Sequence, residues 1–168
     1  MNKVLRLLLA EDSASDGELV IRQLRNAGYQ VEAERVDDID AMRRALAGSV
    51  WDLIVSDYHM PGFDARDALR LLQETGRDIP FVVVSGVIGE EAAVQMMRAG
   101  AHDYFMKGNL TRLGSAVERE LRQAANRADA RRSSERIAEL NATLDHAQTI
   151  VQKLDGTIML WNSGAIAL

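Results

Sequence analysis

Short strand-like segments, most of them apolar, alternate along the chain with segments of helical periodicity, and this alternation limits the possible folds more than any other feature. The strand-like segments lie at residues 4–10, 29–36, 52–57, 80–85 and 103–106. The helical segments lie at residues 19–27, 39–47, 64–74 and 90–99, and a last one opens at Leu110. Strands that alternate with helices form a parallel sheet covered on both faces. We therefore predict an α/β fold, a doubly wound five-stranded parallel sheet, with a C-terminal helical extension.

Composition and charge exclude several classes of protein. The 168 residues include no cysteine, which excludes disulfides and thiolate metal sites. The net charge of −5 argues against a nucleic-acid partner, because proteins that bind phosphate backbones are usually basic. The apolar run at residues 4–10 ends at Glu11 and is too short to cross a membrane. We expect no membrane contact in this segment and a cytoplasmic location.

Acidic residues follow two of the predicted strands, Glu11 and Asp12 after the first and Asp57 at the end of the third. The carboxyl ends of parallel strands meet at one edge of the sheet, where ligands bind in such folds. Like charges that lie together need neutralising, and Mg²⁺ prefers a few carboxylates together with water and phosphate oxygens. The pattern predicts a Mg²⁺ site, and the alternative interpretation is a set of solvated loop acids.

The same edge receives Ser85 from the fourth predicted strand and Lys107 from the fifth. A hydroxyl donates to a phosphoryl oxygen, and an ammonium neutralises its charge. Phosphoryl transfer depends mainly on positioning and charge neutralisation. Taken singly, Ser85 is typical of a strand-end cap and Lys107 of a surface charge. Together they favour phosphoryl transfer, with Asp57 as the nucleophile that forms an acyl phosphate.

Four motifs lie around these strand ends. They are Glu11-Asp12, Asp57-x-x-Met60-Pro61, Ser85-Gly86 and Gly100-Ala101-x-x-Tyr104-x-x-Lys107. In type, order and spacing they resemble the receiver domain of two-component response regulators, as in chemotaxis regulators, over about residues 1–121. The resemblance implies a flavodoxin-like fold. It also implies that Asp57 accepts a phosphoryl group from the phosphohistidine of a sensor histidine kinase or a phosphotransfer protein.

The resemblance further implies a role for each site residue. The implied Mg²⁺ ligands are Asp12, Asp57, the backbone carbonyl of His59 and, through water, Glu11. Lys107 would contact the phosphoryl group. Ser85 and Tyr104 match a switch pair, in which the hydroxyl moves to the phosphate and the aromatic ring turns inward behind it.

Two positions depart from the family pattern. Gly108 stands where such receivers usually carry a proline with a cis bond. Because a cis bond to a non-proline residue costs about 2.5–4 kcal/mol, we expect a trans or heterogeneous bond between Lys107 and Gly108. His59 lies two residues after Asp57, where its side chain could touch the metal or tune the lifetime of the phosphate. A solvated loop histidine is the favoured interpretation.

Beyond about Leu121 the sequence changes character. Residues 124–136 are rich in Ala, Arg and Ser, and a seam with alternating spacings of three and four follows them. The seam residues are Ile137, Leu140, Leu144, Ala147, Val151 and Leu154. This spacing favours a coiled coil and a homodimer through the C-terminal helix. The alternative is an amphipathic helix that packs on its own domain.

The last twenty or so residues resemble the opening hairpin of a PAS domain. Asp155-Gly156 is a two-residue hairpin signal between two strand-like segments, and it competes with the last heptad for the same residues. We divide the chain into a receiver at 1–125, a linker helix at 126–148 and the truncated start of a PAS-like domain at 149–168.

Several functions are compatible with this organisation. The first is a receiver that regulates a PAS-linked output module, either a histidine kinase or a cyclic-dinucleotide enzyme such as a diguanylate cyclase. In that interpretation the receiver is a regulatory phosphoacceptor, and any enzymatic activity belongs to a longer protein. The second is a free-standing receiver that acts by docking. A third, a Mg²⁺-dependent phosphohydrolase, is disfavoured because His59 occupies the position of the usual second acid. A nucleotide-binding fold is disfavoured because no Gly-rich loop follows the first strand.

Overall fold

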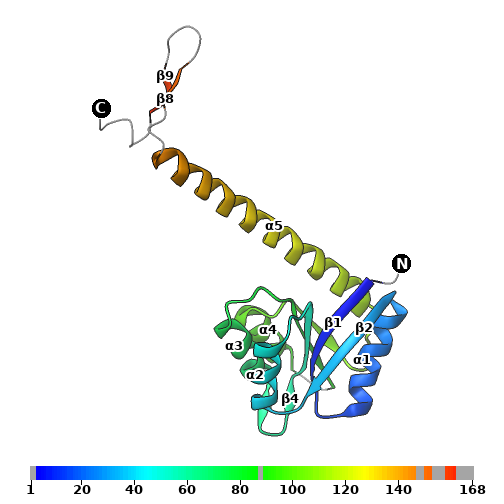
Figure 1. Cartoon of the computed structure of the whole chain (residues 1–168). Coiled ribbons are helices and arrows are strands. Elements are labelled where there is room, and N and C mark those ends of the chain that lie inside the picture. The colour runs from blue at the N-terminus through cyan, green and yellow to red at the C-terminus, as the bar shows by residue number, and fades with distance from the viewer. Residues whose placement is uncertain (1–2, 87–88, 147–149, 153–157, 162–168) are drawn as a thin grey trace. The chain divides into compact units, whose positions relative to one another are not determined.

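The structure is a computed structural model that describes residues 3–86, 89–146, 150–152 and 158–161. The chain divides into two compact units, Met1–Ala124 and Ala125–Leu168. The first unit contains the central sheet and the helices that cover it (Figure 1).

The central sheet has five parallel strands in the order β2-β1-β3-β6-β7. Its strands are β1 (Lys3–Ala10), β2 (Tyr29–Val36), β3 (Leu53–Asp57), β6 (Phe81–Ser85) and β7 (Asp103–Met106). Among the described residues the helices are α1 (Ala14–Asn26), α2 (Ile39–Gly48), α3 (Ala65–Glu74), α4 (Glu90–Ala99) and α5 (Leu113–His146). The predicted doubly wound parallel sheet with a C-terminal helix is therefore confirmed.

Burial along the strands explains their sequences. Every residue of β3 and β6 is buried, as expected for central strands covered on both faces. β2 is an edge strand, and only its two end residues, Tyr29 and Val36, are buried. The charged residues between them disfavour pairing of this edge with a strand of another molecule.

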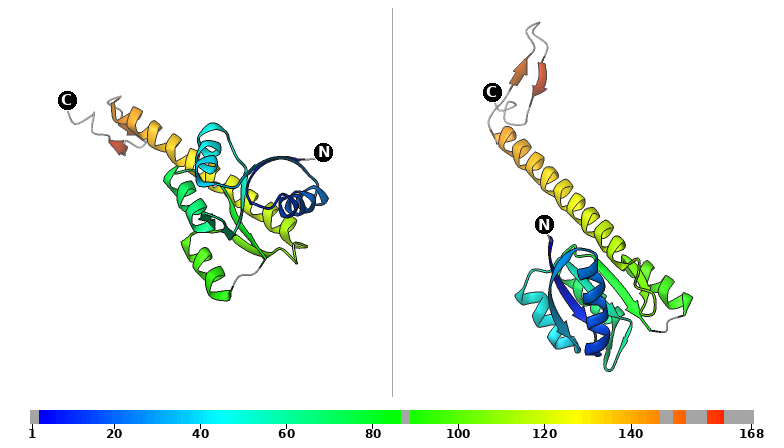
Figure 2. Two further views of the ribbon diagram at one scale, coloured as in Figure 1. Left: turned by 90° about the horizontal axis from the view of Figure 1, so that it is seen from below. Right: turned by 90° about the vertical axis from the view of Figure 1, so that its right-hand side faces the viewer.

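Two apolar clusters lie on opposite faces of the sheet, and Figure 2 shows the helices on either side. One cluster joins the sheet to α2, α3 and α4, through residues such as Met42, Leu69 and Met96. The other joins it to α1 and the start of α5, through Leu24 and Leu113. Burying apolar surface on both faces stabilises the sheet and fixes the direction in which its strand ends point.

Short polar side chains begin the helices. Ser13 caps α1 and Asp38 caps α2, each accepting a backbone N–H of the first turn. Asp64 caps α3 and takes part in a reciprocal capping box with Asp67. At the other end of α4, Gly100 adopts a left-handed conformation with φ of 114°, which terminates the helix.

A small hairpin follows β3. Its strands are β4 (His59–Met60) and β5 (Phe63–Asp64), which pair antiparallel around the predicted turn at Met60-Pro61-Gly62. Gly62 has a φ of 85°, which favours glycine in the turn. The hairpin connects the end of β3 to Asp64, the capping residue of α3.

The helix α5 differs in part from expectation. It begins at Leu113 rather than Leu110 and runs unbroken to His146. The predicted heptad seam therefore ends earlier than its spacing indicated, because Val151 lies in strand β8 (Ile150–Gln152). Seam residues Ala147 and Leu154 lie outside the described residues. No helix in the described part of the chain is both long and apolar enough to cross a membrane.

The strands β8 and β9 (Ile158–Trp161) pair antiparallel, as the hairpin signal predicts. The pairing includes a register shift between Val151 and Gln152. The predicted turn residues Asp155 and Gly156 lie outside the described residues.

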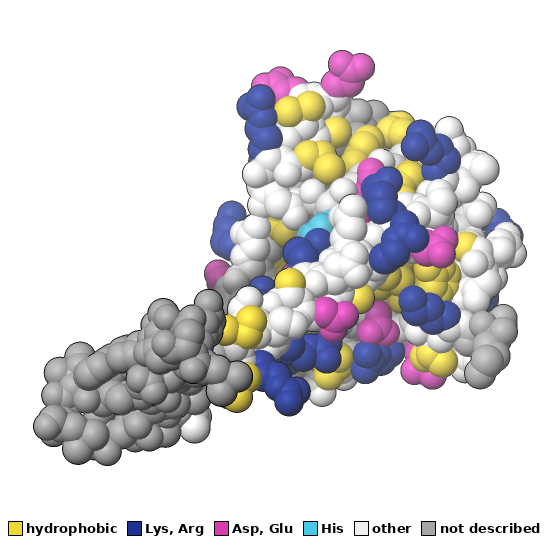
Figure 3. All heavy atoms as spheres, turned by 90° about the horizontal axis from the view of Figure 1, so that it is seen from above, with side chains coloured by type: hydrophobic (Ala, Val, Ile, Leu, Met, Phe, Trp, Pro, Cys, Tyr) yellow, Lys and Arg dark blue, Asp and Glu magenta, His cyan; other side chains and the backbone are white. Residues whose placement is uncertain are grey.

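The face of the structure in Figure 3 carries Lys and Arg side chains interspersed with Asp and Glu side chains, around several patches of hydrophobic side chains. This mixture of charges accords with the composition of the chain, which has 20 basic and 25 acidic residues.

The cap of α3 gives a prediction about stability. Asp64→Ala removes the acceptor of the backbone N–H groups of Arg66 and Asp67, so the free energy of unfolding should fall by about 1 kcal/mol. Asp64→Asn keeps a capping oxygen, so its free energy of unfolding should fall much less. Urea unfolding of the three proteins measures the difference, and equal stability of wild type and Asp64→Ala would contradict the role of the cap.

Candidate functional site

The predicted site residues gather at the carboxyl edge of the central sheet. Glu11 follows β1, Asp57 ends β3, Ser85 ends β6 and Lys107 follows β7. The backbone N–H of Lys107 donates to the carbonyl of Ser85 at 2.8 Å, which ties the two strand ends together. The paired residues that set this alignment are Ala10 with Ser56, Asp57 with Val84, and Ser85 with Met106.

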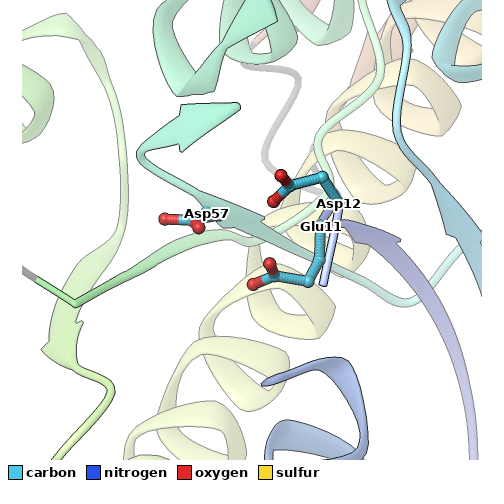
Figure 4. A group of neighbouring side chains, drawn as sticks. All are labelled: Glu11, Asp12 and Asp57. Carbon is cyan, nitrogen blue, oxygen red and sulfur yellow. The ribbon is translucent and has the colours of Figure 1, made fainter. Parts of the chain in front are cut away.

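Glu11, Asp12 and Asp57 form one group of carboxylates (Figure 4). Each offers an oxygen, and these oxygens lie within 4.8 Å of one another. Glu11 and Asp57 are buried, whereas Asp12 is exposed. Carboxylate oxygens in a partly exposed group suit Mg²⁺, which keeps several waters as ligands, so the residues fit the predicted ion.

Lys107 supplies a positive charge to this edge. Its Nζ lies 2.8 Å from Oε2 of Glu11, 2.7 Å from Oδ2 of Asp57 and 2.7 Å from Oδ2 of Asp16. Burial lowers the pKa of the Lys107 ammonium, but the hydrogen bonds to Asp16, Asp57 and Glu11 outweigh burial and raise the pKa above its ordinary value. The lysine is therefore a permanent cation at neutral pH.

Glu11 is the most enclosed of the acids, with 1% of its surface exposed. Burial raises the pKa of its carboxyl, although hydrogen bonds from Lys107 and from the backbone N–H of Ser13 act in the opposite direction. Arg35 donates to the backbone carbonyls of Glu11, at 2.7 Å, and Asp12, at 3.2 Å. This guanidinium at the end of β2 holds the loop that carries the two acids.

Two of these contacts come from residues that the motifs do not include. Asp16 lies in the first turn of α1, three residues after the capping residue Ser13. A helix that begins directly after Glu11-Asp12 keeps its first residues near the end of β1. The sequence could therefore have indicated Asp16 as a neighbour of the two acids. Arg35 offered no such signal, since charged residues are common on edge strands.

Ser85 and Tyr104 lie on neighbouring strands and on the same face of the sheet. Ser85 is buried, with 3% exposed, and Tyr104 is half-buried against the cluster that includes Val83, its own pairing partner. The hydroxyl of Tyr104 donates to Sδ of Met106 at 2.7 Å. Their role as a switch pair stays a prediction.

The two departures from the family pattern have definite positions. The bond between Lys107 and Gly108 is trans, since the described residues contain no cis peptide bond, and the expected trans geometry is confirmed. The backbone N–H of His59 donates to Oδ1 of Asp57 at 3.4 Å, while its side chain is exposed. The carbonyl of His59 as a metal ligand stays a prediction.

Comparisons with known proteins agree with this geometry. The family model of the response regulator receiver domain matches residues 7–118. Response regulator protein FleR of Pseudomonas aeruginosa is 31% identical over 102 residues, which cover 61% of this chain and 21% of FleR. The aligned part of the chain thus spans about a fifth of the length of that curated relative.

Two solved structures extend the comparison. The receiver domain of a signal transduction histidine kinase from Syntrophus aciditrophicus is 29% identical, with a TM-score of 0.57 over 71% of this chain and 91% of that chain. The N-terminal domain of a response regulator/sensory box/GGDEF three-domain protein from Carboxydothermus hydrogenoformans is 23% identical, with a TM-score of 0.62 over 73% of this chain and 98% of that one. The second likeness concerns the fold alone.

The carboxylate group predicts a response to Mg²⁺. A cation that binds only the folded site should raise the unfolding temperature, and at one hundred times its Kd the gain is about 2.7 kcal/mol. Asp12→Asn should weaken this response and raise stability without Mg²⁺, because it relieves repulsion among the acids. Thermal unfolding with and without Mg²⁺ provides the measurement.

Glu74→Gln is the matched control, because it removes one exposed carboxylate at the end of α3, away from the strand ends. It should leave the Mg²⁺ response unchanged. An Asp12→Asn protein with a wild-type response to Mg²⁺ would exclude Asp12 as a ligand.

Proposed function

The chain belongs to the response regulator receiver domain family, and from this premise we propose that Asp57 accepts a phosphoryl group from the phosphohistidine of a partner protein. The partner is a sensor histidine kinase or a phosphotransfer protein of a two-component system. We also propose a cytoplasmic location for this segment. The receiver itself is a regulatory phosphoacceptor.

The main support is the contact between Oδ2 of Asp57 and Nζ of Lys107, at 2.7 Å, beside the carboxylate group. In the transfer, a carboxylate oxygen of Asp57 attacks phosphorus and a P–O bond forms. The P–N bond of the donor breaks, and the imidazole nitrogen keeps the electron pair. No oxidant or further reactant is needed.

Each neighbouring group has a defined task in this proposal. Lys107 neutralises the negative charge on the phosphoryl oxygens, and the hydroxyl of Ser85 donates a hydrogen bond to one of them. A Mg²⁺ ion held by Asp12, Asp57, the carbonyl of His59 and, through water, Glu11 would supply further charge neutralisation when bound. Tyr104 turns inward once Ser85 has moved, and this changes the surface of α4 and β7.

The output of the receiver is proposed to be a PAS-linked module. Two observations support this: α5 is one unbroken helix from Leu113 to His146, and the strands β8 and β9 follow it in the chain as an antiparallel pair. The Syntrophus receiver, which is 29% identical to this chain, belongs to a signal transduction histidine kinase. The alternative, a free-standing receiver that acts by docking, does not explain the length of α5.

The exposed part of α5 is proposed to pair with the same helix of a second copy. Ile137 and Leu140 lie one turn apart and are 59% and 57% exposed. Apolar side chains at this spacing gain from burial against a second identical stripe. A change at Asp57 would then reach the output module as a change in how the two helices pack.

Phosphorylation provides the direct test of the function. Incubation with acetyl phosphate and Mg²⁺ should add one phosphoryl group to the wild-type chain, seen by intact mass. Asp57→Asn or a chelator should abolish the addition, because the nucleophile or the cation is then missing. Asp64→Asn serves as a control with the same charge change outside the carboxylate group, and labelling that survives Asp57→Asn would contradict the assignment.

Light scattering tests the helix pairing. The wild-type chain should be dimeric, and Ile137→Asp with Leu140→Asp should make it monomeric, because charges then replace the apolar stripe. Ala138→Asp with Ala142→Asp adds the same two charges away from the stripe and should leave the dimer intact. A wild-type chain that stays monomeric at high concentration would contradict the proposal.

A further inference from the structure

We propose that Asp16 is a positioning residue that retains Lys107 in the unphosphorylated protein and so sets how readily Asp57 keeps a phosphoryl group. The inference rests on the proposed function, because it concerns the lysine that would contact that group. It adds to the site an acid on helix α1 that is outside the carboxylate group of Glu11, Asp12 and Asp57.

The contact of Asp16 with Lys107 is as short as the contact of Asp57. Nζ of Lys107 lies 2.7 Å from Oδ2 of Asp16 and 2.7 Å from Oδ2 of Asp57. The two acids approach the lysine from different elements, α1 and β3. An ammonium has three N–H donors, and the third acid, Glu11 at 2.8 Å, uses the remaining one. The lysine is therefore fully occupied before any phosphoryl group arrives.

The position of Asp16 is fixed by the start of α1. Its backbone N–H donates to Oγ of the capping residue Ser13 at 3.3 Å, and Gly17 beside it packs against β1 so closely that an added Cβ would lie 2.9 Å from Leu9. The helix thus holds Asp16 beside the strand ends. The Nζ of Lys107 thus contacts Asp16, whose side chain is 33% exposed, as well as the more buried acids Glu11 and Asp57.

This arrangement makes Asp16 a competitor of the phosphoryl group in two ways. A phosphoryl group on Asp57 needs donors from Lys107, and the hydrogen bond to Asp16 must loosen or be shared. The carboxylate of Asp16 also adds a negative charge close to the phosphoryl oxygens, which raises the free energy of the phosphorylated form. Both effects have the same sign, so removal of the Asp16 charge should favour the phosphorylated form.

A second interpretation of Asp16 is purely local. An acid in the first turn of a helix is stabilised by the helix dipole, and this would require no contact with the site. The two interpretations differ in what they predict for ligand binding at Asp57. A dipole interaction affects the stability of α1, whereas retention of Lys107 affects the affinity of Asp57 for a phosphoryl mimic.

The experiment measures binding of beryllofluoride, a phosphoryl mimic for aspartate carboxylates, to the full chain at saturating Mg²⁺. Asp16→Asn should raise the affinity about two- to fivefold, the range expected for one partly exposed charge pair. Asp16→Glu keeps the charge and should return the affinity toward the wild-type value. Glu18→Gln removes a charge from the exposed face of the same helix and should bind like wild type. Unfolding temperatures show that each variant is folded.

The outcomes separate this inference from the proposed function. If wild type binds beryllofluoride and Asp16→Asn and Glu18→Gln bind it with the same affinity, the role of Asp16 is overturned. The proposed function then remains intact. A weaker affinity in Asp16→Asn would overturn it as well. A wild-type chain that binds no beryllofluoride would overturn the proposed function and this inference with it.

Discussion

The arrangement of the first unit depends on one electrostatic constraint, the presence of two buried carboxylates at the same edge of a sheet. Glu11 is 1% and Asp57 8% exposed, and buried charges are costly unless a partner of opposite sign lies beside them. Lys107 provides that partner within 2.8 Å of both acids. One cation therefore holds together the ends of β1, β3 and β7.

The parallel sheet makes this convergence possible. Lys107 is 91 residues from Asp16 and 50 from Asp57 along the chain, so only the fold brings their side chains together. Helices on both faces bury the strands and leave the polar side chains at the carboxyl ends. The site is thus built on the ends of regular elements, and Ser85 and Tyr104, the proposed switch pair, lie at one side of it on β6 and β7.

The second unit raises a different physical problem. The helix α5 begins in the apolar layer beneath the sheet, through Leu113 and Val117, and continues into residues whose side chains are mostly exposed. Its later apolar residues, Ile137 and Leu140, have no apolar layer within the described chain to cover them. A long helix with one sparse apolar stripe is suited to carry a change in packing from one domain to the next.

The sequence by itself determined the order of strands and helices along the chain, and the acids, serine and lysine at the strand ends, because periodicity and short motifs are local properties of the chain. It did not determine that α5 ends at His146, because the seam and the hairpin competed for the same residues. It also missed Asp16 and Arg35. Only the tertiary structure decided those contacts, because a helix start and an edge strand place ordinary surface residues beside a site far away in sequence.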